Sequence, residues 1–339
     1  MTKKKIFVLA TLVYFFLAPF TFHPDVKVNY FHAGFLSKGI FNIYSFLNQD
    51  REAGLLGVFS YPPLAYFVLG ILHPLVKLLA GPGFSEWTGM GNDAVGVTHI
   101  FQYLFAMKFP FIVIHILTGI VLARLVDGRK GLVAALFWFF NPVSLYVVPV
   151  MGQFDGMVVL LTLLSLLTIS KKPTFSGLLL GLGAALKTYP LLLLPFAAIV
   201  GGKNLWERIK IFLVGAIVPL LFWSAYLKTP EFYESNLVSG LSQRLYELKF
   251  QVGFGESIVL IPAILIILLL YSIYHDLGKG ENLYKYFFAV TFLVVTGSHF
   301  HPQWVLWSMP FLAMIIVKKK MDLSIVSGSI LLFLGYIFK

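Results

Sequence analysis

The chain has 339 residues, of which 58% are hydrophobic and 12% are charged, and its mean hydropathy is +0.85. A soluble domain cannot bury so much apolar surface, so lipid must be the main solvent of this fold. The formal net charge of +11 does not indicate a nucleic-acid-binding protein, because the basic residues gather in short clusters at the ends of apolar segments. The absence of cysteine excludes disulfides and thiolate metal sites.

The apolar segments are continuous and lack the alternation of a membrane β-barrel. We therefore expect an all-α polytopic membrane protein with a single domain over residues 1–339. Lysines at positions 3–5 precede the first apolar run, Ile6 to Phe20, and place the N-terminus in the cytoplasm. This start resembles a signal peptide, but no small-x-small cleavage site follows, which favours an uncleaved first helix.

Residues 21–60 form a first external loop in this topology. Its aromatic and aliphatic residues fall roughly on one helical face, which predicts helices lying along the membrane surface. Four apolar runs follow, at 61–80, 98–125, 131–151 and 155–170. One crossing each would leave basic residues near positions 124–130 and 171–172 on the outer side, against the positive-inside rule. Splitting 98–125 at Lys108–Pro110 into two half-length segments removes both violations.

A second hairpin of half-length segments, 175–186 and 190–201, is predicted around the stretch "KTYP". Gly177 and Gly181 within it have the small-xxx-small spacing that favours close helix packing. Beyond this hairpin the sides alternate regularly, with 229–256 as a second external loop, and the chain has about 10–12 membrane segments in all. The later segments are 211–227, 257–274, 284–298, 304–317 and 323–338.

The polar residues that interrupt the segments all fall on the outer side. Each has an explanation without chemistry, since a loop carboxylate can be solvated, a lysine can snorkel and an aspartate can cap a helix. Together, two carboxylates suited to general-base catalysis or metal binding and two lysines suited to a lipid-linked phosphate indicate chemistry on a lipid-borne anion. The residues are Asp25, Lys108, Asp155, Lys187, Tyr189, His299, His301 and Gln303.

Five stretches in order resemble the GT-C superfamily of integral-membrane glycosyltransferases, which take sugar from polyprenyl phosphate. Asp25 follows the first helix, and "YPPL" opens the next one. An Asn-Pro pair then precedes "GQFDG" and a long helix, while "GLLLGLGAALKTYPLLLLP" and "HPQWVLWSMPFLA" complete the set. The resemblance spans nearly the whole chain. It points to the branch that includes the catalytic subunit of GPI mannosyltransferase I and related prokaryotic enzymes that depend on polyprenol-phosphate-mannose.

The resemblance implies an inverting transfer of a hexose, with mannose favoured, to a lipid, glycan or protein acceptor. The reaction is expected on the periplasmic, extracellular or ER-lumenal face. Asp25 matches the family's first-loop carboxylate, which deprotonates or hydrogen-bonds the acceptor hydroxyl, and Lys108 and Lys187 would stabilise the departing phosphate. The expected donor-binding and supporting residues are Tyr189, His299, His301, Gln303, Gln153 and Asp155.

The first loop departs from part of the family, in which several members carry a paired acidic motif. Here Asp25 is followed by Val26 and Lys27, and the next acids are Asp50 and Glu52. A divalent metal such as Mn²⁺ or Mg²⁺ is therefore disfavoured, and we expect no cofactor.

Two other functions stay open: a transporter or flippase of lipid-linked sugars, and a non-catalytic subunit of a membrane glycosylation complex. A transporter is expected to carry ionisable groups near mid-membrane and to show repeat symmetry. In this chain the charges gather at segment edges and no repeat period stands out. Substitution of Asp25 separates the classes, because an enzyme would lose turnover and a scaffold would be unaffected.

Overall fold

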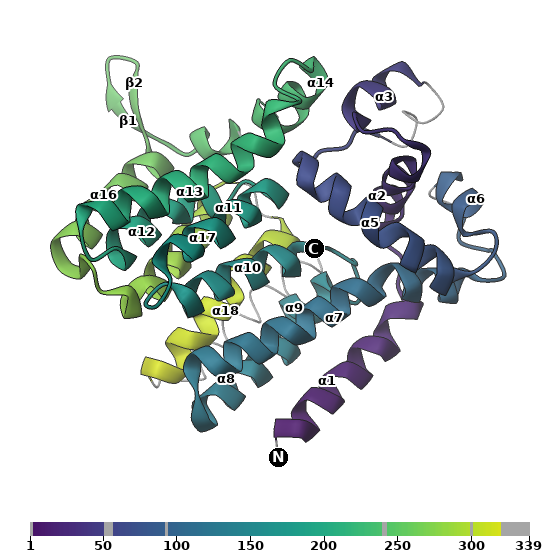
Figure 1. Ribbon diagram of the computed structural model, residues 1–339, viewed down its shortest axis with the longest axis horizontal. Helices are drawn as coiled ribbons and strands as arrows, with labels where there is room; N and C mark the ends of the chain where they lie inside the picture. Colours follow the sequence, from purple (N-terminus) through teal and green to yellow (C-terminus); the bar gives the residue numbers. More distant parts are fainter. Residues whose placement is uncertain (1–2, 51–56, 92–93, 239–242, 299–300, 320–339) are drawn as a thin grey trace.

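The computed structural model describes residues 3–50, 57–91, 94–238, 243–298 and 301–319, which form a bundle of helices (Figure 1). The strands in this described part are β1 (Lys249–Gly253) and β2 (Glu256–Val259), which pair antiparallel as a hairpin. The main helices are α1 (Lys3–Leu17), α2 (Pro24–Gly34), α3 (Ile43–Gln49), α5 (Pro63–Ala80), α6 (Phe84–Gly89), α7 (Ile100–Val126), α8 (Gly128–Phe140), α9 (Pro142–Val147), α10 (Asp155–Thr168), α11 (Pro173–Leu186), α12 (Pro190–Gly201), α13 (Leu205–Ser224), α14 (Pro230–Phe232), α16 (Leu260–Asp276), α17 (Leu283–Gly297) and α18 (Pro302–Lys319).

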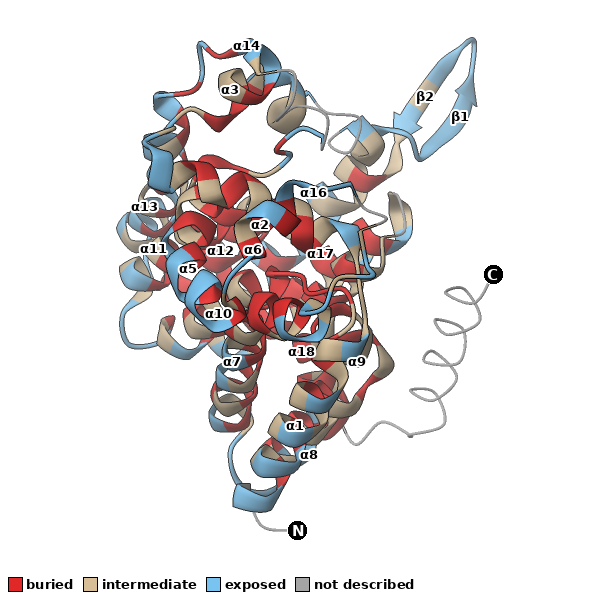
Figure 2. Cartoon of the chain, turned by 90° about the vertical axis from the view of Figure 1, so that its right-hand side faces the viewer, coloured by how far each residue is buried: buried red, intermediate tan, exposed pale blue. Residues whose placement is uncertain are grey.

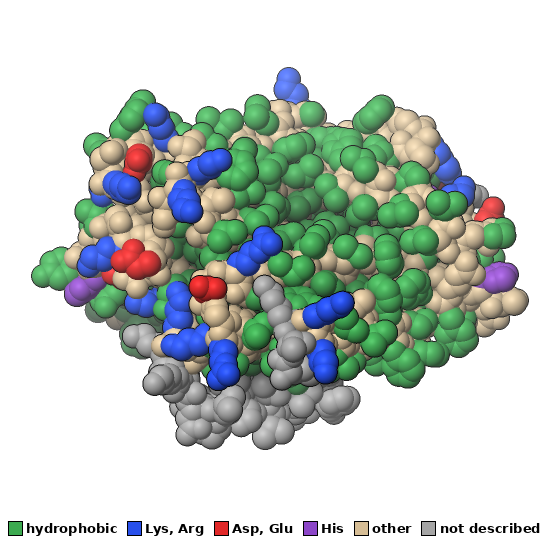
Figure 3. All heavy atoms as spheres, turned by 60° about the horizontal axis from the view of Figure 1, so that its bottom comes forward, with side chains coloured by type: hydrophobic (Ala, Val, Ile, Leu, Met, Phe, Trp, Pro, Cys, Tyr) green, Lys and Arg blue, Asp and Glu red, His purple; other side chains and the backbone are tan. Residues whose placement is uncertain are grey.

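The helices confirm the prediction of an all-α polytopic membrane protein. Two of them, α5 and α7, are each long and apolar enough to cross a membrane. A third candidate span combines α1 with α2 and bends by 85° between them. Figure 3 shows a broad apolar surface on the side of the N-terminus, where Lys and Arg side chains are frequent and Asp and Glu are few. This charge pattern is typical of a membrane protein.

Helix α7 is continuous where the sequence predicted a hairpin, so the split at Lys108–Pro110 is wrong. The Lys108 side chain is fully buried. Its ammonium donates to the carbonyl oxygens of Ala18 (2.9 Å) and Thr21 and to the Thr21 hydroxyl (2.8 Å). These acceptors lie where α1 ends and the chain bends toward α2. These acceptors satisfy the hydrogen-bonding capacity of the ammonium inside the protein. The helix therefore does not have to end at Lys108 to expose the charge to water.

The second predicted break, at "KTYP", is confirmed. Helix α11 ends at Leu186, Lys187 has an extended backbone, and α12 begins at Pro190. A proline at the first helical position loses no hydrogen bond, since its N–H would have been unsatisfied there in any case. The two helices pack against each other. The predicted segment 131–151 is likewise divided into α8 and α9.

Helices α3 and α14 and the β1–β2 hairpin, from the described parts of the two predicted external loops, lie at the end of the molecule opposite the N-terminus (Figures 1 and 2). The first loop contains α2 and α3, and the second contains α14 and part of the exposed β1–β2 hairpin. Helix α2 packs against α5, α6 and α7. Helix α2 also contacts the chain after α6, because the Lys27 ammonium donates hydrogen bonds to the carbonyl oxygens of Met90 and Gly91 at 2.6 Å each. The location of these helices along a membrane surface stays a prediction. The last predicted segment, 323–338, lies outside the described residues.

Small residues allow α11 and α13 to approach closely. A Cβ atom added at Gly177 would lie 2.4 Å from the carbonyl oxygen of Ile211, and one at Gly181 would lie 2.5 Å from that of Gly215. Both obstructing atoms belong to the backbone, so the helices would have to separate to admit a side chain. The spacing of Gly177 and Gly181 is therefore used for helix packing, as the sequence predicted.

We expect Gly177→Ala to lower the free energy of unfolding by about 1–3 kcal/mol, because overpacking at this crossing outweighs the gain in helix propensity. The measurement is unfolding in detergent followed by circular dichroism. Gly156→Ala is a matched helical control, since the nearest atom to its added Cβ is 3.9 Å away. An equal effect of the two substitutions would contradict the close crossing.

Candidate active site

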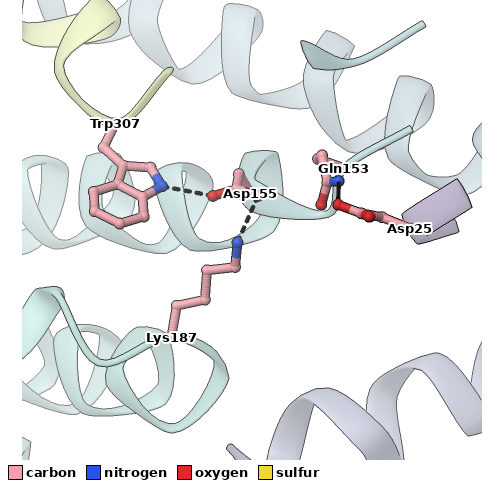
Figure 4. A network of polar contacts seen from close by, with 5 residues as sticks. All are labelled: Asp25, Gln153, Asp155, Lys187 and Trp307. Atoms are coloured by element: carbon pink, nitrogen blue, oxygen red, sulfur yellow. Dashed lines mark hydrogen bonds and ion pairs between the residues drawn. The ribbon is translucent and has the colours of Figure 1, made fainter. Parts of the chain in front are cut away.

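The centre of the site is a buried carboxylate with two partners, one at the end of α11 and one in α18 (Figure 4). Asp155 lies in the first turn of α10 and has no exposed surface. Its Oδ2 lies 2.7 Å from the Nζ of Lys187, and its Oδ1 accepts a hydrogen bond of 2.6 Å from the indole N–H of Trp307. A charge so deeply buried is tolerated only when it is paired and hydrogen-bonded, and both conditions are met here.

Lys187 reaches Asp155 because α11 ends at the preceding residue. The backbone of Lys187 is extended, so its side chain leaves the axis of α11 and crosses toward α10. Its ammonium also lies 4.9 Å from the ring centre of Tyr61 and 4.8 Å from that of Phe154. Two aromatic faces and one carboxylate thus surround the cation, which stabilises its charge in a region with little water.

A stack of aromatic rings holds Trp307 in place. The rings of Tyr189 and Trp307 are 4.1 Å apart and nearly parallel. The stack continues from Trp307 to Trp304 at 5.3 Å and from Trp304 to His301 at 6.0 Å. Because Tyr189 follows the α11–α12 break and the other three rings lie at the start of α18, the stack joins these two segments beside the Asp155–Lys187 pair.

Asp25 lies beside this buried pair and is accessible to solvent. Its side chain is 40% exposed, and its Oδ2 accepts a hydrogen bond of 3.0 Å from the amide nitrogen of Gln153. The Nδ1 of His23 accepts the backbone N–H of Asp25 at 3.3 Å. Burial lowers the pKa of His23, the nearby Asp25 raises it in part, and Lys108 lowers it further. The imidazole is therefore neutral at pH 7, and it can serve as the acceptor that caps α2.

A glycine turn brings Gln153 to Asp25. Gly152 has a φ of +70°, a conformation that side chains other than glycine rarely adopt. A Cβ at this position would also lie 3.0 Å from the Lys108 side chain and 3.1 Å from Val26. The loop between α9 and α10 can therefore pass close to α2, and this approach places the Gln153 amide next to the Asp25 carboxylate.

The structure thus brings together most of the side chains that the sequence singled out. Asp25, Gln153, Asp155, Lys187 and Tyr189 lie in one region, next to the start of α18, which carries the partly buried His301 and the buried Gln303. The Lys108 ammonium points instead to the end of α1. Its role in phosphate binding stays a prediction, as do the donor-binding roles of the other residues. His299 lies outside the described residues.

Two residues of this region were not selected from the sequence. Trp307 lies within a motif of the resemblance, four residues after Gln303, and a buried indole N–H requires an acceptor. Tyr61 opens the "YPPL" stretch. Besides the neighbouring ring of Phe59, it contacts the Lys187 ammonium and the Phe154 ring, and these two groups, which belong to the site, are distant in the chain. That distance leaves no local pattern by which the sequence could have identified it.

The acidic and histidine side chains of the described chain do not gather into a metal site. No group of three or more His, Asp or Glu residues close enough to hold a metal ion occurs within the ranges the structure describes. Independence from metals stays a prediction.

A comparison with protein families decides the class of the protein. The family model described as Glycosyltransferase family 87 matches residues 59–297. The chain belongs to glycosyltransferase family 87. This family is of the GT-C type, as the sequence motifs predicted, so the protein is an integral-membrane glycosyltransferase that uses a sugar donor and an acceptor. The matched residues include Asp155 and Lys187, whereas Asp25 and Gln303 lie outside them. No curated protein and no solved structure matches the chain.

We expect Asp155→Asn to lower the free energy of unfolding by about 3–5 kcal/mol, because it leaves the Lys187 ammonium buried without a counter-charge. Lys187→Met should cost a similar amount. The double variant should cost less than the sum of the two, since neither charge then remains unpaired. The measurement is a double-mutant cycle of unfolding in detergent. Strictly additive effects would contradict a stabilising pair.

Proposed function

We propose that the protein transfers a hexose, with mannose favoured, from a polyprenyl-phosphate donor to a hydroxyl of a lipid, glycan or protein acceptor. The observation that carries this proposal is the accessible Asp25 carboxylate, held by Gln153 beside the buried Asp155–Lys187 pair. A membrane glycosyltransferase that acts on a hydroxyl needs a base that its acceptor can reach. The family match favours an enzyme over a transporter, a flippase or a non-catalytic subunit.

The two carboxylates differ in their fitness for this role. Asp155 has no exposed surface, and both of its oxygens are engaged, one by Lys187 and one by Trp307. Asp25 accepts one side-chain hydrogen bond from Gln153 and keeps 40% of its side chain exposed. An acceptor hydroxyl can therefore approach Asp25, whereas at Asp155 it would have to displace an ion pair. This contrast supports Asp25 as the general base.

The proposed reaction is a single displacement. The acceptor oxygen passes its proton to Asp25 and forms a bond to the anomeric carbon of the donor sugar. The bond between that carbon and the phosphate oxygen breaks at the same time, and its electron pair leaves with the polyprenyl phosphate. Attack from the face opposite the leaving group inverts the configuration. The ammonium of Lys187 carries three N–H donors, and those not directed at Asp155 would stabilise the departing phosphate.

The reaction is proposed for the non-cytoplasmic face of the membrane. Lysines before α1 favour a cytoplasmic N-terminus, and α2, which carries Asp25, begins after α1 has ended. This orientation puts Asp25 on the periplasmic or extracellular side of a prokaryotic membrane, or in the ER lumen of a eukaryote. A lipid-borne donor in the outer leaflet would then meet its acceptor at that surface.

Asp25→Asn should lower the rate of sugar transfer about 10²- to 10⁴-fold without changing the unfolding temperature, because it removes the base and keeps the side-chain volume. The measurement is transfer in liposomes from labelled polyprenyl-phosphate mannose to a mixed pool of membrane lipids. Glu256→Gln, on the exposed hairpin, is the matched control. Full activity in Asp25→Asn would assign the base to another residue. A wild type without transfer from any polyprenyl donor would favour a flippase.

We also expect transfer to be insensitive to EDTA, because the proposed chemistry rests on a carboxylate and an ammonium without a metal ion. The comparison is the initial rate with EDTA, without it, and with added Mn²⁺. A loss of activity in EDTA that Mn²⁺ restores would contradict this expectation.

A further inference from the structure

Tyr61 lies between the accessible carboxylate and the buried ion pair. Its ring centre is 4.9 Å from the Lys187 ammonium and 4.8 Å from the ring of Phe154, the residue before Asp155. Its phenol is close enough to both Asp25 and Asp155 for each carboxylate to influence its ionisation. In a single displacement, the base and the group that stabilises the leaving phosphate must lie on opposite sides of the reacting sugar. Tyr61 adjoins both groups.

The position of Tyr61 is well determined by its neighbours. Its carbonyl oxygen accepts a hydrogen bond of 2.6 Å from the hydroxyl of Tyr44. The two prolines that follow, Pro62 and Pro63, restrict the backbone as α5 begins. The phenol itself points toward the side chains of Asn29 and Gln303, which come from α2 and α18. Tyr61 packs against the buried core and keeps part of its surface exposed.

Two buried amide oxygens near Tyr61 have no hydrogen-bond partner within the described part of the chain. They are the Oε1 atoms of Gln153 and Gln303, whose side chains are 1% and 6% exposed. The orientation of the Gln153 amide is determined by Asp25, because only its nitrogen can donate to that carboxylate. Burying an amide oxygen without a hydrogen-bond donor is unfavourable. A ligand that supplies O–H groups would give both oxygens the donor that they lack.

The polar atoms around Tyr61 indicate which kind of ligand could bind there. Two amide oxygens and two carboxylates are acceptors, and the carboxylates would repel a phosphate placed among them, while the nearby Lys187 ammonium is already paired with Asp155. A sugar hydroxyl can donate to an amide oxygen and at the same time accept from a phenol. Burial together with the charges of Asp155 and Asp25 raises the pKa of Tyr61, so its phenol stays protonated and can donate.

We propose that Tyr61, Gln153 and Gln303 form the subsite that binds the hydroxyls of the transferred sugar, with Tyr61 as a specificity-determining residue. This proposal rests on the proposed function, and it assigns Gln303 to the sugar and not to the phosphate. Sugar recognition then depends on groups from the α9–α10 loop, the start of α5 and the start of α18, which the ion pair and the aromatic stack hold together.

The test compares two phosphodiester lipids of equal charge that differ only in the sugar: methyl phytanyl phosphate and mannosyl phytanyl phosphate. Dissociation constants are measured by microscale thermophoresis in the same detergent. We expect the wild type to bind the mannosylated lipid about tenfold more tightly, as two or three added neutral hydrogen bonds would allow. Tyr61→Phe, which removes one oxygen, should reduce this preference about fivefold and leave the affinity for methyl phytanyl phosphate unchanged. Gln303→Leu should behave likewise, and Tyr246→Phe, at a 57% exposed tyrosine, is the control.

The outcomes separate this proposal from the one on which it rests. Equal affinity of the wild type for both lipids would overturn the sugar subsite and leave the polyprenyl-phosphate donor standing. Binding of neither lipid would overturn the proposed donor and the subsite with it. An equal loss of affinity for both lipids in Tyr61→Phe would mean that Tyr61 only supports the structure, which also overturns the proposal. If Gln303→Leu fails to fold, Tyr61→Phe decides alone, because its volume is nearly unchanged.

Discussion

A fully buried carboxylate and an almost fully buried ammonium meet where α10 begins and α11 ends, and the arrangement of the site depends on this contact. The pair of Asp155 and Lys187 joins two helices, and the indole of Trp307 brings in a third, α18. Neither charge could remain buried alone. The aromatic stack from Tyr189 to His301 reinforces the same junction. Three segments that are distant in sequence are therefore held in one geometry.

The ion pair also makes the two carboxylates of the region different in burial and in partners. Asp155 is fully engaged and buried, which suits a group that holds helices together. Asp25 is hydrogen-bonded on one side and accessible on the other, which suits a group that takes a proton from a substrate. The residue types alone left both as candidates for the base, and the family resemblance assigned that role to Asp25. Burial and partners distinguish them, and these are properties of the assembled bundle.

Two similar patterns in the sequence had different outcomes in the fold. A lysine followed closely by a proline interrupts an apolar run both at Lys108 and at Lys187, and both predicted a hairpin. At Lys187 the helix does end, and the side chain finds Asp155. At Lys108 the helix continues, because carbonyl oxygens at the end of α1 accept its N–H groups. Those acceptors lie almost ninety residues earlier in the chain, so no local pattern could have revealed them.

The sequence by itself determined the class of solvent, the helical architecture, most helix boundaries and the family. These follow from continuous apolar runs, from prolines at helix starts and from motifs that can be seen along a single chain. It also identified most polar side chains of the site, because a charged or amide group beside an apolar segment is conspicuous. Only the tertiary structure decided how these groups pair, which carboxylate stays accessible, and that Trp307 and Tyr61 belong among them. Pairing and burial depend on which distant segments pack together, and that information lies in the three-dimensional contacts between helices.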